Sequence, residues 1–379
     1  MTTHLCLVSA QVTPNLTPLL DPAIRPDHVI LAVSADMQRQ AEWLEQFIKP
    51  RGIKVSRWTI DNPYDIVGIR ERIYNRMEDM ENSEQLILNA TGGTKPMSIA
   101  AYEVFSDLGL PIFYVHPEKD RLIWLHPKDR GHQDLADRIK LEEFLGVHGA
   151  QVVGTVQRQG VNHRELSVCE YLVEEIDRFS RPLGALNWLA GSAENNLRSR
   201  PLNDLNNPDD DLELLIDYFA ANNFLQLRNN RLVFTDEQDR FFVNGGWLEL
   251  YAYDMCAQLR SKYGLQDLGR NIQVQRTQRG KGIPNELDLA LLLDNRLHIV
   301  ECKTKKWDDK GPGAEALYKL DTLKDLLGGL NARAMLISYQ PLPDRDRQRA
   351  VDLRIEVCAG RGLHRLREKL RQWLGLEAG

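Results

Sequence analysis

Four charged residues lie inside a segment that otherwise reads as a buried β-hairpin. The segment is "IPNELDLALLLDNRLHIVECKTK", from Ile283 to Lys305, and the four residues are Glu286, Asp288, Glu301 and Lys303. Leucines, isoleucine and valine surround them, which predicts that both strands belong to a core. Because an unpaired charge in a core is costly, we expect these side chains to hold a charged ligand.

The register of the hairpin decides which charges meet. A two-residue turn at Asp294-Asn295 would place Asp288 opposite Glu301, and Glu286 opposite Lys303. A turn one residue later would pair Asp288 with Lys303 instead. In both registers all four side chains share one face, because side chains alternate along a strand with a period of two.

Two facing carboxylates repel each other unless a cation lies between them. Mg²⁺ and Mn²⁺ prefer such oxygen ligands, and they also bind substrate phosphate. Lys303 could then orient an attacking water or stabilise charge on phosphorus. Glu249, in the upstream helical pattern "GWLELYAYDMCAQLRSK", could supply a further oxygen. The predicted chemistry is metal-assisted hydrolysis of a phosphodiester.

The charge of the chain is unevenly distributed. The 379 residues carry a formal net charge of −6, but residues 241–379 hold 23 Lys and Arg against 18 Asp and Glu. A basic run between Gln258 and Pro284 is either a solvated face or a phosphate-binding surface. Its basic residues are Arg260, Lys262, Arg270, Arg276, Arg279 and Lys281.

Composition indicates a soluble, multidomain protein. The chain is 42% hydrophobic, and it shows neither a signal peptide nor an apolar run long enough to cross a bilayer, so we expect a cytoplasmic protein. Its five cysteines are far apart and form no C-x-x-C pair, so we expect buried thiols and neither a zinc site nor a disulfide framework.

The first 130 residues alternate short apolar runs with amphipathic ones. This alternation predicts a mostly parallel, Rossmann-like sheet, with "RLIWLHP" as an antiparallel edge strand. Ligands collect at the carboxyl ends of such strands, where "SAQVTPNLTPLL" and "GGTKPM" would lie. These loops fit an anionic or nucleotide-like ligand; the alternative for the second is a glycine turn that caps a helix.

Residues from about 150 to 240 read as helices followed by a hairpin that turns at Asn229 and Asn230. The expected helices are 166–181, 183–196 and 210–227. This order is typical of a winged-helix-like module. Because the module carries the acidic run Asp209 to Asp211 and no basic recognition helix, a linking or dimerisation role is favoured over sequence-specific DNA reading.

The charged hairpin resembles the catalytic motif of the PD-(D/E)XK nuclease superfamily. The match rests on Asp288 and on Glu301-Cys302-Lys303, with Leu287 where the family often has Pro, and with Glu249 as the upstream helical acid. The resemblance implies that Asp288, Glu301 and the Cys302 carbonyl bind the metal and that Lys303 assists the water. Tyr318 is a tentative supporting residue on the following helix.

The front of the chain is similar to CARF domains, the CRISPR-associated Rossmann-like sensors of cyclic oligoadenylates. The whole arrangement looks like the CARF nuclease effectors of type III CRISPR defence, which implies activation by cyclic tetra-adenylate, a homodimer, and RNA or DNA as substrate. The ligand-binding residues that this resemblance implies are Ser9, Gln11, Asn15, Thr91, Gly92, Gly93, Thr94 and Lys95.

The expected fold is α/β with three units. Residues 1–148 form a Rossmann-like CARF domain, 149–240 a small winged-helix-like module, and 241–379 a restriction-endonuclease-like domain. The expected function is a metal-dependent nuclease gated by cyclic tetra-adenylate, with Mn²⁺ or Mg²⁺ as cofactor and no membrane partner. Two alternatives are a CARF-type transcription regulator and an ungated repair or restriction-type nuclease.

Overall fold

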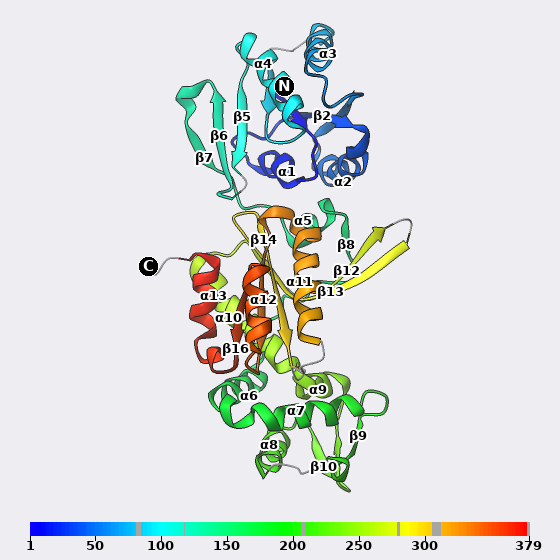
Figure 1. The fold of residues 1–379 in the computed structure, drawn as a ribbon, viewed down its shortest axis with the longest axis vertical. Helices are drawn as coiled ribbons and strands as arrows, with labels where there is room; N and C mark the ends of the chain where they lie inside the picture. Colours follow the sequence, from blue (N-terminus) through cyan, green and yellow to red (C-terminus); the bar gives the residue numbers. More distant parts are fainter. Residues whose placement is uncertain (81–84, 117, 206–209, 279–280, 305–311, 377–379) are drawn as a thin grey trace.

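Seven strands form the first sheet of a computed structural model, which describes residues 1–80, 85–116, 118–205, 210–278, 281–304 and 312–376 (Figure 1). Their order is β3-β2-β1-β4-β5-β6-β7, with β1 to β5 parallel and the last two antiparallel. The Rossmann-like prediction and its antiparallel edge are confirmed. The elements are β1 (Thr3–Leu7), α1 (Thr13–Leu20), β2 (His28–Ser34), α2 (Gln38–Ile48), β3 (Lys54–Ile60), α3 (Ile66–Glu78), β4 (Leu86–Asn89), α4 (Lys95–Asp107), β5 (Ile112–His116), β6 (Arg121–His126) and β7 (His132–Asp134).

A second, six-stranded sheet carries the charged hairpin. Its order is β16-β15-β14-β13-β12-β8, and β14, β15 and β16 run parallel. The helix-strand order expected from sequence up to β15 is confirmed, whereas α12, β16 and α13 were missed. The elements are α5 (Leu141–Val147), β8 (Ala150–Val152), α10 (Trp247–Tyr263), β12 (Asp267–Gln278), β13 (Lys281–Leu293), β14 (Arg296–Lys303), α11 (Pro312–Gly328), β15 (Arg333–Ser338), α12 (Asp344–Asp352), β16 (Ile355–Ala359) and α13 (Leu366–Leu374).

The middle part of the sequence, before the charged hairpin, forms helices and a three-stranded sheet. The turn at Asn229 and Asn230 is confirmed, with φ of 49° and 62°. The expected helix boundary before Leu183 is wrong: the break lies at Glu175, and Pro182 is inside a helix. Asp209 lies outside the described residues. The elements are α6 (His163–Glu174), α7 (Ile176–Ser192), β9 (Arg198–Pro201), α8 (Asp210–Ala221), β10 (Gln226–Arg228), β11 (Arg231–Val233) and α9 (Glu237–Phe241).

The units share cores. One cluster of buried side chains joins the middle helices to α10 and to one face of β13 and β14, and a second joins α1 and α2 through α5 to the other face of the hairpin and to α11. β8, which the sequence assigns to the middle module, pairs with β12. The three domain boundaries therefore stay a prediction, while packing ties each unit to the next.

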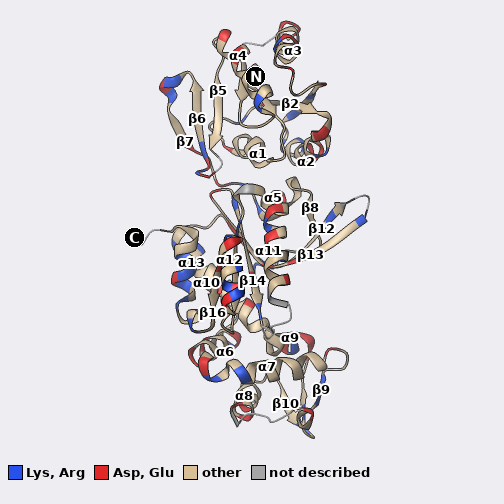
Figure 2. Cartoon of the chain, in the orientation of Figure 1, with Lys and Arg blue, Asp and Glu red and all other residues tan. Residues whose placement is uncertain are grey.

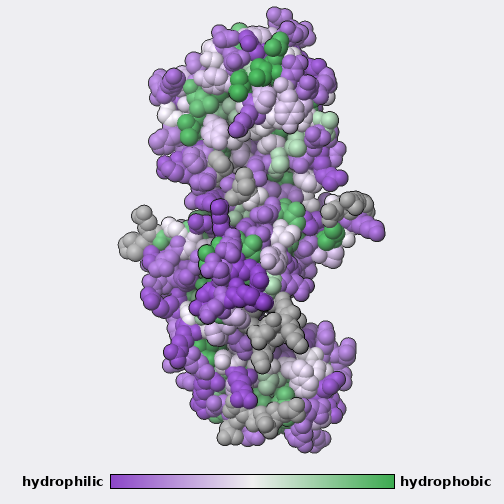
Figure 3. Space-filling view, viewed as in Figure 1, coloured by the Kyte–Doolittle hydropathy of each residue, from purple (hydrophilic) through white to green (hydrophobic). Residues whose placement is uncertain are grey.

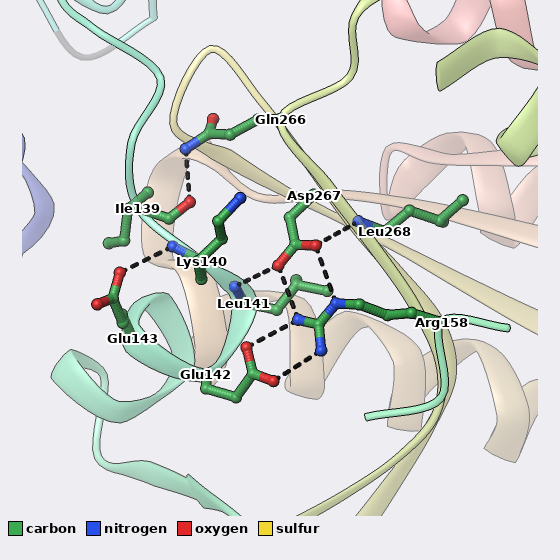
Figure 4. Close-up of polar contacts among 9 residues, drawn as sticks. All are labelled: Ile139, Lys140, Leu141, Glu142, Glu143, Arg158, Gln266, Asp267 and Leu268. Atoms are coloured by element: carbon green, nitrogen blue, oxygen red, sulfur yellow. Dashed lines mark hydrogen bonds and ion pairs between the residues drawn. The ribbon is translucent and has the colours of Figure 1, made fainter. Parts of the chain in front are cut away.

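A polar network supports the seam where α5 meets β12 (Figure 4). Asp267, whose side chain is 2% exposed, accepts hydrogen bonds from Arg158 at 2.9 Å and from the backbone N–H of Leu141 at 3.0 Å. Burial raises its pKa, but these donors hold the pKa of Asp267 below its usual value. Glu142 also binds the Arg158 guanidinium, through two hydrogen bonds of 2.8 and 2.9 Å. A buried charge is thus fully paired at this seam.

The turn of the hairpin docks into the first domain. The Asn295 side chain donates to Asp120 at 2.6 Å and accepts from Gln266 at 2.7 Å, and the Asn295 backbone N–H donates to Gln266 at 2.9 Å. Arg296 donates to the Glu118 carbonyl at 3.1 Å. The β5–β6 turn of the first domain therefore holds the turn end of the hairpin, whose strands carry Asp288 and Glu301 nearer their other end.

The basic run extends over α10, β12 and β13. Arg260 and Lys262 end α10, Arg270 lies 5.5 Å over the Tyr253 ring, and Arg276 belongs to the β12–β13 arm that projects from the body (Figure 2). Arg279 lies outside the described residues. Whether this run is a solvated face or a phosphate-binding surface stays a prediction.

Two further expectations can be checked. All five cysteines are free and buried, as predicted. In the described part of the chain, no helix is both long and apolar enough to cross a membrane.

Candidate functional site

The hairpin adopts the first of the two predicted registers. Leu289 pairs with Val300 and Leu293 with Arg296, and the two turn residues have φ of 49° and 50°. Asp and Asn tolerate this left-handed conformation better than most residues, which explains why the turn falls at Asp294 and Asn295. The register that pairs Asp288 with Lys303 is therefore wrong.

Strand β13 changes faces at Asp288. Leu287 packs in the core on the α11 side, whereas Leu289 packs in the core on the α10 side, although residues two apart normally share a face. The neighbouring strand is irregular at the same level, where Asn271 has a φ of 50°. Because the strand changes faces between Leu287 and Leu289, the alternation on which the shared face of Glu286 and Asp288 was predicted does not hold, and Glu286 is exposed. The irregularity sets Asp288 apart from the regular ladder.

Asp288 and Glu301 are held by different partners. Asp288 Oδ2 accepts a hydrogen bond from the Cys302 backbone N–H at 2.7 Å. Glu301 is 3% exposed, and its Oε1 lies 2.6 Å from Lys303 Nζ. Burial and the Glu301 charge raise the pKa of Asp288 above its usual value. Burial lowers the pKa of Lys303, but the Glu301 charge outweighs this and raises it.

Glu249 joins this group from the first turn of α10. Burial, followed by the charges of Asp288, Glu286 and Glu301, raises the pKa of Glu249 well above its usual value. A helix N-terminus favours the charged carboxylate, so the crowding of acids outweighs that effect here. The structure therefore gathers the three predicted acids and the predicted lysine in one electrostatic neighbourhood.

The chemistry of this group fits a hard divalent cation. The pKa values of Glu249 and Asp288 are raised beside the Glu301 charge, which a cation would relieve, and the Cys302 carbonyl adds a neutral oxygen. Within the described residues, however, no three His, Cys, Asp or Glu side chains are grouped as metal ligands. Glu301 is turned to Lys303 and Asp288 to a backbone N–H, so binding an ion would require these carboxylates to exchange partners.

Helix α11 contributes a lysine that the sequence did not single out. Lys319 Nζ lies 4.0 Å from Glu301 Oε1. Tyr318, the tentative supporting residue, is 52% exposed and stacks with Arg349 at 5.4 Å. Adjacent helical residues point about 100° apart, so only one of them can face the sheet. Aligning the helical period of α11 with strand β14 would have identified Lys319 from the sequence.

Four of the predicted ligand residues line a cavity of about 200 Å³ at the carboxyl ends of β1 and β4. Gly92 is needed there, because a Cβ at this position would lie 1.9 Å from the Leu7 carbonyl oxygen. The sequence missed three lining residues, including Asn331 from the second sheet's connection after α11. The lining residues are Ser9, Gln11, Pro14, Thr91, Gly92, Tyr114 and Asn331.

The other predicted ligand residues have structural surroundings. Asn15 is buried, and its side chain donates to the Leu7 carbonyl and accepts from Asn89. Thr94 caps α4 by accepting from the Met97 N–H, and Gly93 has a φ of 72°. Lys95 is exposed at the start of α4 and does not line the cavity. Asn15 and Thr94 thus support the loops. The predicted ligand residues that line the cavity remain the expected ligand contacts.

Both parts of the chain match known protein families. Residues 3–144 match the Card1 CARF domain, and residues 236–376 match the Card1-like endonuclease domain. The crystal structure of protein VC1899 from Vibrio cholerae is 30% identical, with a TM-score of 0.91 over 99% of this chain and 98% of that one. The chain belongs to the Card1 family of CARF-domain endonucleases.

Further relatives agree with this assignment. The structure of Can2 from Sulfobacillus thermosulfidooxidans in complex with cyclic tetra-adenylate is 26% identical, with a TM-score of 0.83 over 99% of both chains. A type III CRISPR defence DNA nuclease activated by cyclic oligoadenylate shares the fold at 19% identity, with a TM-score of 0.64 over 99% of this chain and 52% of that one. Among curated proteins, none matches the chain. This Card1-family chain is a CARF nuclease effector of type III CRISPR, which confirms the resemblance drawn from the sequence.

Proposed function

We propose that this chain is a nuclease that hydrolyses phosphodiester bonds of RNA or DNA with the help of Mn²⁺ or Mg²⁺ once cyclic tetra-adenylate binds its CARF domain. The observation that carries the proposal is the group of buried acids and lysine at Asp288, Glu301, Lys303 and Glu249. It lies in the part of the chain that matches an endonuclease domain. The Can2 complex with cyclic tetra-adenylate supports the choice of activator.

Each active-site residue has a proposed role. Asp288, Glu301, Glu249 and the Cys302 carbonyl would hold the cation, which when bound supplies Lewis acidity and an activated water. Lys303 keeps a raised pKa beside Glu301 and therefore stays protonated at neutral pH. Its ammonium group can orient the attacking water and offset negative charge on the phosphate as the bond to phosphorus forms.

The ligand cavity supports a two-fold arrangement. Its volume of about 200 Å³ is below the ~300–1,000 Å³ typical of pockets for drug-sized ligands, so one protomer can hold only part of a cyclic tetranucleotide. A homodimer would offer the same donors to both halves of the ring.

An exposed apolar surface on the CARF domain supports this homodimer. Val67 on α3 and Ile99 and Tyr102 on α4 are 64%, 48% and 37% exposed. Figure 3 shows apolar atoms at the top of the molecule, where α3 and α4 lie. Because such patches often mark interfaces between proteins, we infer that these helices face the second protomer. A monomer by light scattering, with and without activator, would contradict this inference.

The function can be tested with one nuclease assay. Labelled single-stranded and duplex RNA and DNA are incubated with Mn²⁺ or Mg²⁺, with and without cyclic tetra-adenylate. We expect cleavage only with both metal and activator, and loss of cleavage in Glu301→Gln. Glu356→Gln is the matched control, because Glu356 also pairs with a lysine, Lys369 at 2.5 Å, but on the outer strand β16.

The outcomes separate the alternatives. Cleavage that needs metal but not the activator would favour an ungated repair or restriction-type nuclease. Tight duplex binding without any cleavage would favour a transcription regulator. Full activity in Glu301→Gln would overturn the assignment of the site.

A further inference from the structure

A large hollow lies between α7 and the carboxyl ends of β14 and β15. Its volume is about 1230 Å³, and the middle module forms one of its walls. In Figure 1, α7 and α9 lie below the end of β14 that carries Glu301 and Lys303. Ligands of open parallel sheets bind at this edge, so the position of the hollow is typical of a binding site.

The hollow reaches the active site. Thr304, which lines it, directly follows Lys303, and its carbonyl accepts a hydrogen bond of 2.8 Å from the Asn187 side chain on α7. On the other side of Thr304, Gly245 approaches so closely that a Cβ there would lie 2.2 Å from Thr304 Oγ1. The wall of the hollow is therefore fixed to the residue beside the catalytic lysine.

Side chains in the hollow offer an aromatic face and free positive charge. Trp188 is 44% exposed, and the Arg200 guanidinium lies 5.8 Å over its ring. Arg181 and Arg200 make no ion pair with any described residue, and Glu194 is the one acidic residue among the described residues of the lining. Arg240 also lines the hollow, but Glu237 binds it. A stacking surface beside unpaired guanidinium groups is the combination that binds single-stranded nucleic acid.

A neighbouring hollow differs from this one in the partners of its cations. It begins at Pro341 and has a volume of about 610 Å³. Its cations already have carboxylate partners, because Arg365 pairs with Glu368 at 2.9 Å and Lys369 with Glu356 at 2.5 Å. None of the described residues in its lining is aromatic. The first hollow is therefore the better candidate for a polyanion.

We propose that the hollow between α7 and β14 binds a single-stranded segment of the nucleic-acid substrate, with a base stacked on Trp188 and phosphates bound by Arg181 and Arg200. This inference rests on the proposed nuclease function and gives the middle module a role in positioning the substrate. A single strand is specified because a base must leave its stack to reach the Trp188 face, which duplex pairing opposes.

Binding without cleavage tests the proposal. Anisotropy of fluorescein-labelled single-stranded RNA and DNA is measured in EDTA, with and without cyclic tetra-adenylate, for wild type and four variants. We expect Trp188→Ala to weaken binding about tenfold and Trp188→Phe to restore most of it. Arg200→Gln should lower the slope of log affinity against log salt by about 0.7. The matched control is Arg198→Gln, because Arg198 is also exposed on β9 but does not line the hollow.

The assay distinguishes two kinds of failure. If wild type binds and cleaves but Trp188→Ala and Arg200→Gln bind like Arg198→Gln, the proposed groove is overturned while the nuclease function stands. If wild type neither binds nor cleaves any strand, the proposed function is overturned, and the groove with it. An increase in KM with unchanged kcat for Trp188→Ala in the activated enzyme would support the positioning role.

Discussion

Buried carboxylates lie at both ends of the β13–β14 hairpin, but the partners that stabilise these carboxylates differ. At the turn, burial raises the pKa of Asp120 to about 7, and the donors around Asp120 are neutral amides such as the Asn295 side chain. At the open end, the Glu301 carboxylate faces Lys303 at 2.6 Å and Lys319 at 4.0 Å. The turn end thus pairs its carboxylate with a neutral donor, whereas the open end pairs its carboxylate with cations. The contacts of the turn end dock the hairpin on the first domain, and the proposed metal site lies at the open end.

This difference suggests how the two ends communicate. Paired strands transmit displacement well, because their hydrogen bonds and register fix one against the other. A ligand that moves the β5–β6 turn of the CARF domain would also move Asn295 and hence the strands that carry Asp288 and Glu301. Such a movement becomes allosteric if the ligand binds one arrangement more tightly than the other.

The largest effect is expected at the open end. Glu301→Gln should lower the cleavage rate about 10³-fold, because it removes one proposed oxygen ligand and the partner of Lys303. It should also lower the pKa of Asp288, since the Glu301 charge raises that pKa in the wild type. Single-turnover cleavage and titration of Asp288 by NMR would check both effects. An unchanged Asp288 pKa would show that the two carboxylates do not interact.

The next effect concerns the seam beside the turn end. Arg158→Ala should destabilise the fold by about 3 kcal/mol, because it leaves the buried Asp267 carboxylate without its cationic partner. The depressed pKa of Asp267 contributes stability that is present above its unfolded pKa and lost as pH falls through its folded pKa. Denaturant unfolding at pH 7 and below pH 4 would measure both. Arg365→Ala is the control, since its partner Glu368 is 42% exposed and the pair is worth under about 1 kcal/mol.

The Asn295→Gly variant removes the docking contacts of the turn but keeps its backbone conformation. Glycine accepts the φ of 50° at this position, so the turn should persist while the side-chain bonds to Asp120 and Gln266 are lost. We expect a loss of about 2 kcal/mol in unfolding free energy. The ratio of activated to basal cleavage should fall while the affinity for cyclic tetra-adenylate stays the same. An unchanged activation ratio would exclude the turn as the connection.

The smallest effect is a change in pH dependence. Asp120 has a folded-state pKa of about 7 against a reference of 3.8, so its contribution to stability is highest at low pH and is lost as pH rises through about 7. Asp120→Asn keeps an acceptor for Asn295 and removes the buried charge. It should raise the unfolding free energy at pH 8 by at least about 1 kcal/mol and leave it unchanged at pH 4. The fully exposed Asp344 offers a control, because Asp344→Asn should change neither value.

Local signals allowed much of the fold and the hairpin to be predicted. Alternating apolar runs indicate the Rossmann-like strands, and two adjacent residues that tolerate positive φ fix the turn at Asp294 and Asn295. The rest depends on packing between distant segments. The face change at Asp288 lies beside Asn271 on another strand, and Asn331 reaches the ligand cavity from the segment between α11 and β15. Pro182 led to the wrong helix boundary, because a proline normally interrupts a helix, whereas this one lies within α7.

Helix α11 joins the two functional centres by the shortest stretch of chain. Lys319 on this helix lies beside Glu301, and the segment that follows it places Gly329 against Gln11, so closely that a Cβ would lie 2.4 Å from the Gln11 amide. The 17 residues of α11 span about 25 Å. A helix of this length is stiff, so a ligand that displaces Gln11 and Asn331 would move α11 as a unit and change the distance between the Lys319 ammonium group and the Glu301 carboxylate.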